Sequence, residues 1–158
     1  MGGPQPGTLP GEQALSRISL TLEAEAKAIL LSKETLSRQA LCGAVTALSQ
    51  ASKVVVSGMG KVGHVGVRFA ATLNSTGTPS VFLHPAEAAH GDLGIITQGD
   101  VLVALSNSGK TREVLEMVAG ARSMVPSLTV VGVTGNHRSP LCQENGIFLC
   151  YGRVVEAC

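Results

Sequence analysis

The sequence predicts an α/β fold, a three-layer αβα sandwich built on a doubly wound, mostly parallel sheet of about five strands. Two observations lead to this prediction. Several short apolar segments lack the alternation of apolar and polar residues that is typical of half-exposed strands. This pattern predicts strands covered on both faces. Segments with helical spacing lie between them. In such folds ligands bind in the loops that follow the carboxyl ends of the strands.

Residues 1–11 contain four glycines and three prolines without an apolar period, and we expect them to form a disordered lead-in. The remainder, 12–158, is predicted to be a single domain. It begins with two amphipathic helices, because apolar residues recur every three or four positions from Leu15 to Leu30 and again from Leu36 to Leu48.

The pattern then changes to alternating strands and helices. Strands are predicted at 53–57, 80–84, 101–105 and 128–133, with 147–150 as a candidate fifth strand. Helices are predicted at 61–74, 111–124 and 139–145. The loops at the expected ligand-binding edge are therefore 57–61, 84–94, 106–111, 134–139 and the tail from Tyr151.

The composition argues against several classes of protein. A net charge of +1 and a charged fraction of 15% provide no basic surface for nucleic acid or for an anionic membrane. The four cysteines, which lack the spacing of a redox or zinc site, suggest reduced thiols. We find neither a signal peptide nor a stretch long and apolar enough for a membrane span. A cytoplasmic location is expected.

Two glycine-containing motifs resemble nucleotide-binding loops. Residues 58–63 have the spacing of a dinucleotide-binding turn, but the second strand does not end in the acidic residue that would hold a ribose. Residues 104–111 match a phosphate-binding P-loop only loosely, because Ala104 and Leu105 complete a strand and no other strand ends in an aspartate for magnesium. A nucleotide-binding protein is therefore a disfavoured alternative.

The segment 106–111 has the chemistry of a monophosphate cradle. Hydroxyl and amide donors gather where a helix begins, and the positive end of the helix dipole favours an anion. These donors are Ser106, Asn107, Ser108 and Thr111. The simpler alternative is that Ser108 only caps the helix.

The chain resembles the sugar isomerase (SIS) domain family, and within it the arabinose-5-phosphate isomerases. The resemblance rests on VVVSGMGKVGH at 54–64, AATLNSTGTPS at 70–80, HPAEAAHGDLG at 84–94 and LSNSG at 105–109. It implies a flavodoxin-like αβα fold and a phosphorylated sugar as ligand. The expected reaction is aldose-ketose isomerisation between arabinose 5-phosphate and ribulose 5-phosphate, with no required cofactor.

The resemblance also assigns roles to particular residues. Lys61, His90 and Glu156 are the expected catalytic groups, because isomerisation needs a base to move a proton between C1 and C2 and a cation to stabilise the enediolate. Ser57 and Gly58 are expected to bind the substrate phosphate together with Ser106, Asn107, Ser108 and Thr111. A divalent metal held by His84 and His90 is an alternative to satisfied histidines.

The sequence departs from the family pattern at two places. Lys110 replaces a residue that is usually glutamate in the family, and the chain ends at Cys158, before the family's closing segment. A catalytically silent module that only binds a phosphosugar is therefore the alternative to an isomerase. Because relatives of this family pair, we expect a homodimer or homotetramer, with His90 offered to the neighbouring site.

Overall fold

The computed structural model describes residues 10–154, and these belong to two compact units. One unit holds the N-terminal stretch up to Glu34 together with the chain end from Val154, and the other holds Thr35–Arg153. Most of the predicted lead-in, residues 1–9, lies outside the described residues. Its last two residues, Pro10 and Gly11, begin a helix.

Helix α1, Pro10–Thr35, is the longest element of the described chain. Glu12 in its first turn and Lys33 in its last turn have the charges that the helix dipole favours at those ends. Apolar side chains spaced three and four residues apart remain exposed along it, among them Leu22 at 61% and Ile29 at 71%. No helix of the described residues is long and apolar enough to cross a membrane.

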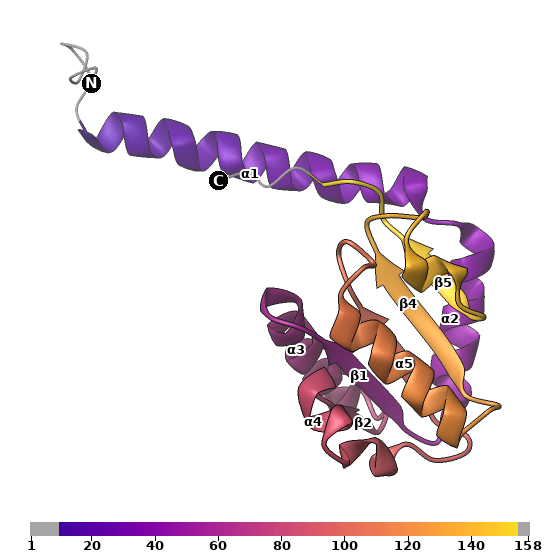
Figure 1. Cartoon of the computed structure of the whole chain (residues 1–158). Coiled ribbons are helices and arrows are strands. Elements are labelled where there is room, and N and C mark those ends of the chain that lie inside the picture. The colour runs from indigo at the N-terminus through magenta and orange to yellow at the C-terminus, as the bar shows by residue number, and fades with distance from the viewer. Residues whose placement is uncertain (1–9, 155–158) are drawn as a thin grey trace. The chain divides into compact units, whose positions relative to one another are not determined.

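The second unit contains a five-stranded parallel sheet in the order β2-β1-β3-β4-β5, which confirms the predicted fold class (Figure 1). Its strands are β1 (Val54–Gly58), β2 (Ser80–Phe82), β3 (Val101–Leu105), β4 (Thr129–Thr134) and β5 (Ile147–Cys150). Every residue of β1 and β3 is buried. These central strands consist mainly of valine, leucine and alanine because neither face meets water.

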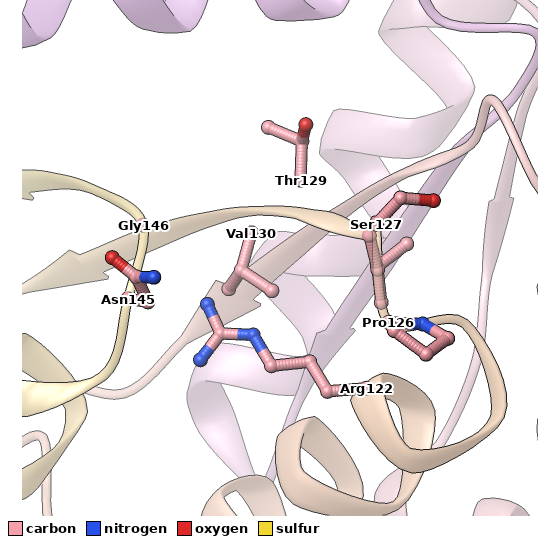
Figure 2. Close-up of a pocket in the computed structure, with 8 residues that line it drawn as sticks. Arg122, Pro126, Ser127, Thr129, Val130, Asn145 and Gly146 are labelled. Atoms are coloured by element: carbon pink, nitrogen blue, oxygen red, sulfur yellow. The ribbon is translucent and has the colours of Figure 1, made fainter.

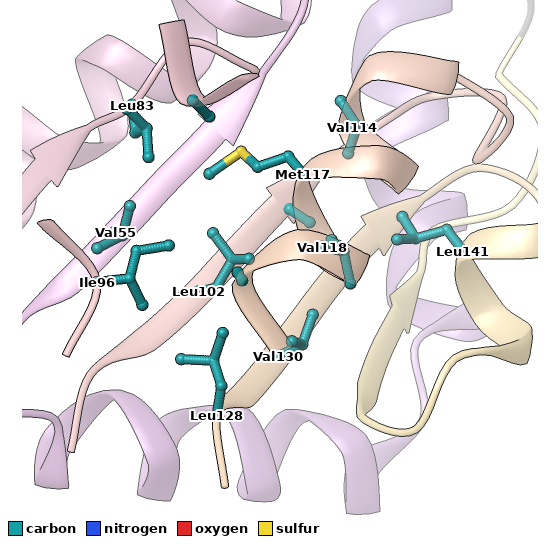
Figure 3. Close-up of a cluster of buried hydrophobic side chains, with 13 residues drawn as sticks. Val55, Leu83, Ile96, Leu102, Val114, Met117, Val118, Leu128, Val130 and Leu141 are labelled. Carbon is teal, nitrogen blue, oxygen red and sulfur yellow. The ribbon is translucent and has the colours of Figure 1, made fainter. Parts of the chain in front are cut away.

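Helices cover both faces of the sheet. On one face, α2 (Arg38–Gln50) and α3 (Lys61–Ser75) pack against alternate residues of the central strands, such as Val54 and Val103. On the other face, α4 (Pro85–Ala89) and α5 (Arg112–Met124) pack against Val55, Leu102 and Val130. Figure 3 shows the second cluster, in which Met117 and Val118 of α5 lie over the strands.

Two segments differ in detail from the predicted elements. The segment 84–94, predicted as a loop, contains α4 and the short 3-10 helix η1 (Asp92–Ile95). The segment 139–145, predicted as a helix, contains only a single 3-10 turn, η2 (Pro140–Gln143). Both are too short to give a clear helical period in the sequence.

The sheet has two edges, and one of them is closed by a side chain. The Asn74 side chain accepts a hydrogen bond from the Ser80 N–H (2.7 Å) and donates one to the Ser80 carbonyl oxygen (2.9 Å). Pro79 and Leu83 form backbone bonds toward β1, so the backbone groups of Ser80 point the other way, toward the sheet edge. Asn74 thus pairs with β2 in place of another strand.

A buried ion pair joins the amino ends of β1 and β3. The Lys53 ammonium contacts the Asp100 carboxylate, whose side chain is 1% exposed. The Thr97 N–H and hydroxyl donate to the same oxygen, at 2.8 and 3.0 Å. Burial alone would raise the pKa of Asp100, but the hydrogen bonds from Lys53 and Thr97 outweigh it and hold this pKa below its ordinary value.

The glycines of the 58–63 motif provide close contact between α3 and β1. Gly60 has φ +62°, a conformation that favours glycine. A Cβ at Gly63 would lie 2.8 Å from the Gly58 carbonyl oxygen, so the first turn of α3 can rest on the strand only without a side chain there. The dinucleotide-like spacing is thus explained by helix–strand packing.

We expect Gly63→Ala to lower the free energy of unfolding by about 1–3 kcal/mol, because the added methyl meets rigid backbone. Denaturant unfolding measures this change. Gly94→Ala is the matched control, since a Cβ there meets nothing within 4 Å. Equal stability of the two variants would contradict the packing role of Gly63.

Candidate functional site

The strand order reverses between β1 and β3, and this places two loops side by side. From β1 the chain continues through α3 to β2 on one side, whereas β3 lies on the other side of β1. The register pairs Ser57 with Ala104 and Gly58 with Leu105, so both strands end at the same level. A crevice between such diverging loops is where open parallel sheets bind ligands.

The loop after β3, 106–111, has a defined internal geometry. The Ser106 and Thr111 hydroxyls are hydrogen-bonded at 2.8 Å, and the Lys110 N–H donates to the Ser108 hydroxyl at 3.2 Å. The N-cap residue of α5 is Thr111, and its side chain makes no capping bond. Ser108 therefore does not cap α5, contrary to the simpler alternative.

The loop after β4 lies directly beneath this segment. Gly109 has φ +63°, and a Cβ at this position would lie 2.0 Å from the Ser139 hydroxyl oxygen and 2.9 Å from that of Thr134. No residue with a side chain fits there. The backbone of 106–111 thus passes immediately over Ser139, which the sequence analysis did not identify as a site residue.

Near the carboxyl ends of β1 and β4, two fully buried serine hydroxyls have no hydrogen-bond partner among the described residues. They belong to Ser57, at the end of β1, and to Ser139, after β4. Buried hydroxyls in folded proteins nearly always have a partner, and leaving one unpaired costs about 1–3 kcal/mol. Both side chains are 0% exposed, so these hydroxyls are unpaired polar atoms covered by the loops and not surface donors.

The loops around the β1–β3 junction carry positive charge. Those after β1, β3, β4 and β5 hold Lys61, Lys110, Arg138 and Arg153 and no carboxylate in their described parts, whereas the segment after β2 holds Glu87 and Asp92. None of the four basic side chains forms an ion pair with another described residue. The exposed cations are thus free to attract a negatively charged ligand.

The predicted catalytic residues lie on three different elements. Lys61 is exposed and is the first residue of α3, beside the end of β1. His90 is exposed at the carboxyl end of α4. Glu156 lies outside the described residues. The residues expected to bind phosphate are brought together at the β1–β3 crevice, and Lys61 lies next to them.

The histidines of the proposed metal site have separate structural roles. His84 is the N-cap of α4, and its Nδ1 accepts a hydrogen bond from the Ala86 N–H at 3.3 Å. His90 ends the same helix. Within the described part of the chain, no group of three or more histidine, cysteine or acidic side chains gathers as metal ligands would.

A hollow of about 370 Å³ lies away from these loops, at the amino end of β4 (Figure 2). Figure 2 shows the Arg122 side chain between Val130 and the Asn145–Gly146 turn. Arg122 Nη1 donates to Glu144 Oε2 at 2.8 Å, so its charge is already paired. This hollow is not the anion site that the loops predict.

Comparison with known proteins agrees with the fold and with the loop chemistry. The family model of the SIS domain matches residues 47–153, and the chain belongs to this family. It is 50% identical over 111 residues to arabinose 5-phosphate isomerase KdsD of Pseudomonas aeruginosa, and 45% identical over 106 residues to KdsD of Escherichia coli K12. These matches cover 70% and 67% of this chain. The chain spans only about a third of each relative, 33% and 32%.

Solved structures show the same arrangement. A candidate phosphosugar isomerase involved in capsule formation, from Bacteroides fragilis, superimposes with a TM-score of 0.86 at 41% identity, covering 92% of this chain and 77% of that one. The c3406 protein of E. coli CFT073, solved in complex with a phosphosugar, gives a TM-score of 0.84 at 31% identity. That match covers 95% of this chain and 79% of the other.

Proposed function

We propose that this protein binds a phosphorylated sugar in the β1–β3 crevice and acts as an aldose-ketose isomerase of the arabinose 5-phosphate type. The observation that carries the proposal is the meeting of the end of β1 with the 106–111 loop, in which Asn107 and Ser108 are exposed hydrogen-bonding groups. Membership of the SIS family and the relatives named arabinose 5-phosphate isomerase support the choice of ligand.

The phosphate is proposed to bind Ser57 and Gly58 together with Ser106, Asn107, Ser108 and Thr111. The hydroxyl, amide and backbone N–H groups of these residues can all donate hydrogen bonds, and a phosphate dianion binds through such donors. The flanking cations add attraction at longer range. Gly109 lets the backbone of this loop pack closely over Ser139 and Thr134, where a Cβ would not fit.

The reaction requires a proton to move between C1 and C2 through an enediolate. In our proposal the Lys61 ammonium, beside the phosphate loops, stabilises the negative charge that develops on the enediolate oxygen. His90 and Glu156 are the candidates for the acid and base that transfer the proton. No contact of His90 or Glu156 with the end of β1 or with the 106–111 loop is described. Lys61 is therefore the best supported of the three.

One observation favours a second candidate function, a module that binds phosphosugars without converting them. Lys110 stands in the loop 106–111 where the family usually has glutamate, and its side chain is exposed. A cation there strengthens the attraction for phosphate, while the carboxylate needed as a base is lost.

Replacing both Ser106 and Ser108 by alanine should weaken binding of arabinose 5-phosphate, measured by calorimetry. Each hydrogen bond to the charged phosphate contributes about 1.5–3 kcal/mol. The double variant Ser127→Ala/Thr129→Val lies at the amino end of β4, away from the candidate site. It is the control and should bind normally. Unchanged affinity in the Ser106/Ser108 variant would contradict the site.

ATP and NAD should bind no better than inorganic phosphate.

Lys110→Glu should increase the rate at which arabinose 5-phosphate is converted to ribulose 5-phosphate. Loss of one acid or base slows a reaction by about a hundred- to ten-thousand-fold, and this substitution restores a carboxylate. Lys110→Gln removes the cation without adding a base, so it should leave turnover low. If the unsubstituted chain already turns over at about 10 per second, the carboxylate is not needed.

We also propose that the protein is a homo-oligomer in the cytoplasm, in which α1 provides the contact. Leu15, Ile18, Leu22 and Ile29 form an exposed apolar stripe along α1. A second copy is the occupant that fits such a stripe, because pairing two amphipathic helices buries both apolar faces. The described cysteines are all free thiols, in keeping with a reducing compartment.

Light scattering should therefore give a mass of at least twice 16.2 kDa. Leu22→Glu should shift the protein toward the monomer, because a carboxylate buried without a partner is unfavourable. Lys27→Gln, an exposed change on the opposite face of the same helix, should leave the assembly intact. A monodisperse mass near 16.2 kDa for the unsubstituted chain would rule out the oligomer.

A further inference from the structure

Asn107, in the middle of the 106–111 loop, is held by hydrogen bonds from the two neighbouring strand ends. Its backbone carbonyl accepts from the Gly135 N–H at 2.9 Å and from the Thr134 hydroxyl at 3.2 Å. Its side-chain Oδ1 accepts from the Tyr151 hydroxyl at 2.5 Å. Tyr151 directly follows β5 and is itself fixed, since its N–H donates to the Thr134 carbonyl at 3.1 Å.

Gly135 leaves the space in which these two side chains meet. A Cβ at this position would lie 3.0 Å from Asn107 Oδ1 and 3.2 Å from the ring carbon Cε2 of Tyr151. Both distances are shorter than ordinary carbon contacts. The chain thus brings together three loops that are separate in sequence, and the phenol meets the amide at their junction.

This contact determines what the Asn107 side chain can offer to a ligand. A carboxamide has an acceptor oxygen on one side and a donor NH₂ on the other, and rotation by half a turn exchanges them. A phenol can donate to Oδ1 or accept from Nδ2, but a separation of 2.5 Å fits an O–H···O bond and is too short for N–H···O, so it selects one orientation. The NH₂ group is then directed away from Tyr151, as a donor for an anion.

The phenol can hold this orientation at neutral pH. Burial raises the pKa of Tyr151, and the neighbouring Cys150 raises it further, so the hydroxyl keeps its proton. Asn107 itself is exposed at the loop surface, where a ligand can reach its NH₂ group.

We propose that Tyr151 is a positioning residue that fixes the carboxamide of Asn107 with its Nδ2 donor toward a phosphate bound by the 106–111 loop. This inference rests on the proposed function. It assigns a role to a residue that contacts the loop from β5 and that the sequence analysis left without one.

A double-mutant cycle tests the inference through binding of arabinose 5-phosphate and of inorganic phosphate, measured by calorimetry. Tyr151→Phe keeps the ring and removes only the hydroxyl, and it should weaken binding roughly two- to tenfold, the range of one hydrogen bond. Asn107→Ala should weaken binding as well. In the Asn107→Ala background, Tyr151→Phe should cause no further loss, because the group through which it acts is absent.

Tyrosine fluorescence gives a second measurement, and it would not respond to phosphate if Tyr151 had only a structural role. Tyr151 is the only tyrosine and the sequence has no tryptophan, so tyrosine fluorescence reports on this residue alone. Phosphate binding should change the fluorescence of the unsubstituted chain and leave that of Asn107→Ala unchanged at matched saturation. Thr129→Val, which removes a hydroxyl at the far end of β4, is the control and should behave like the unsubstituted chain in both measurements.

The outcomes separate the two proposals. If the unsubstituted chain binds neither ligand, the proposed function is wrong and the positioning role is overturned with it. If it binds them but Tyr151→Phe binds equally well, or weakens binding by the same factor with and without Asn107, only the positioning role is overturned. Circular dichroism and thermal unfolding identify any variant that has lost the fold, and in that case Tyr151→Leu, which also removes the hydroxyl, replaces Tyr151→Phe in the cycle.

Discussion

The pairing of β1 with β3 is the constraint on which the rest of the structure depends. Both strands are buried along their whole length, so each needs helices on both faces. Their register is supported at the amino end by the Lys53–Asp100 ion pair, and at the carboxyl end it sets Gly58 level with Leu105. A shift of this register would separate the two loops that form the candidate site.

Two glycines next to the candidate site serve close packing of the chain. Gly63 lets α3 rest on β1, and Gly109 lets the loop after β3 pass over Ser139. Each glycine stands where a neighbouring chain approaches too closely for a Cβ. The spacing that resembles a dinucleotide-binding motif is thus a general solution for bringing a helix against the end of a buried strand, and it carries no nucleotide specificity by itself.

The sequence allowed the layers and the strands to be predicted because valine-rich and leucine-rich segments have a clear local signature. The short elements α4 and η2 could not be predicted well, since each spans about one turn. The contacts at the site were harder still. Asn107 and Tyr151 are 44 residues apart, and Ser139 meets Gly109 only because the loops after adjacent parallel strands converge. Such contacts depend on strand order, which local patterns do not specify.

Because Asn74 pairs with the outer side of β2, the two edges of the sheet differ in their ability to accept a further strand. The outward backbone groups of Ser80 are already paired, so a further strand is disfavoured beside β2. At the other edge, β5 has no outer strand partner among the described residues. Any added strand, whether from a longer form of this chain, from a second molecule or from misfolding, should therefore join at β5. Because Tyr151 follows β5 and donates to Asn107, an added strand at that edge would lie beside the strand that leads into this contact with the 106–111 loop.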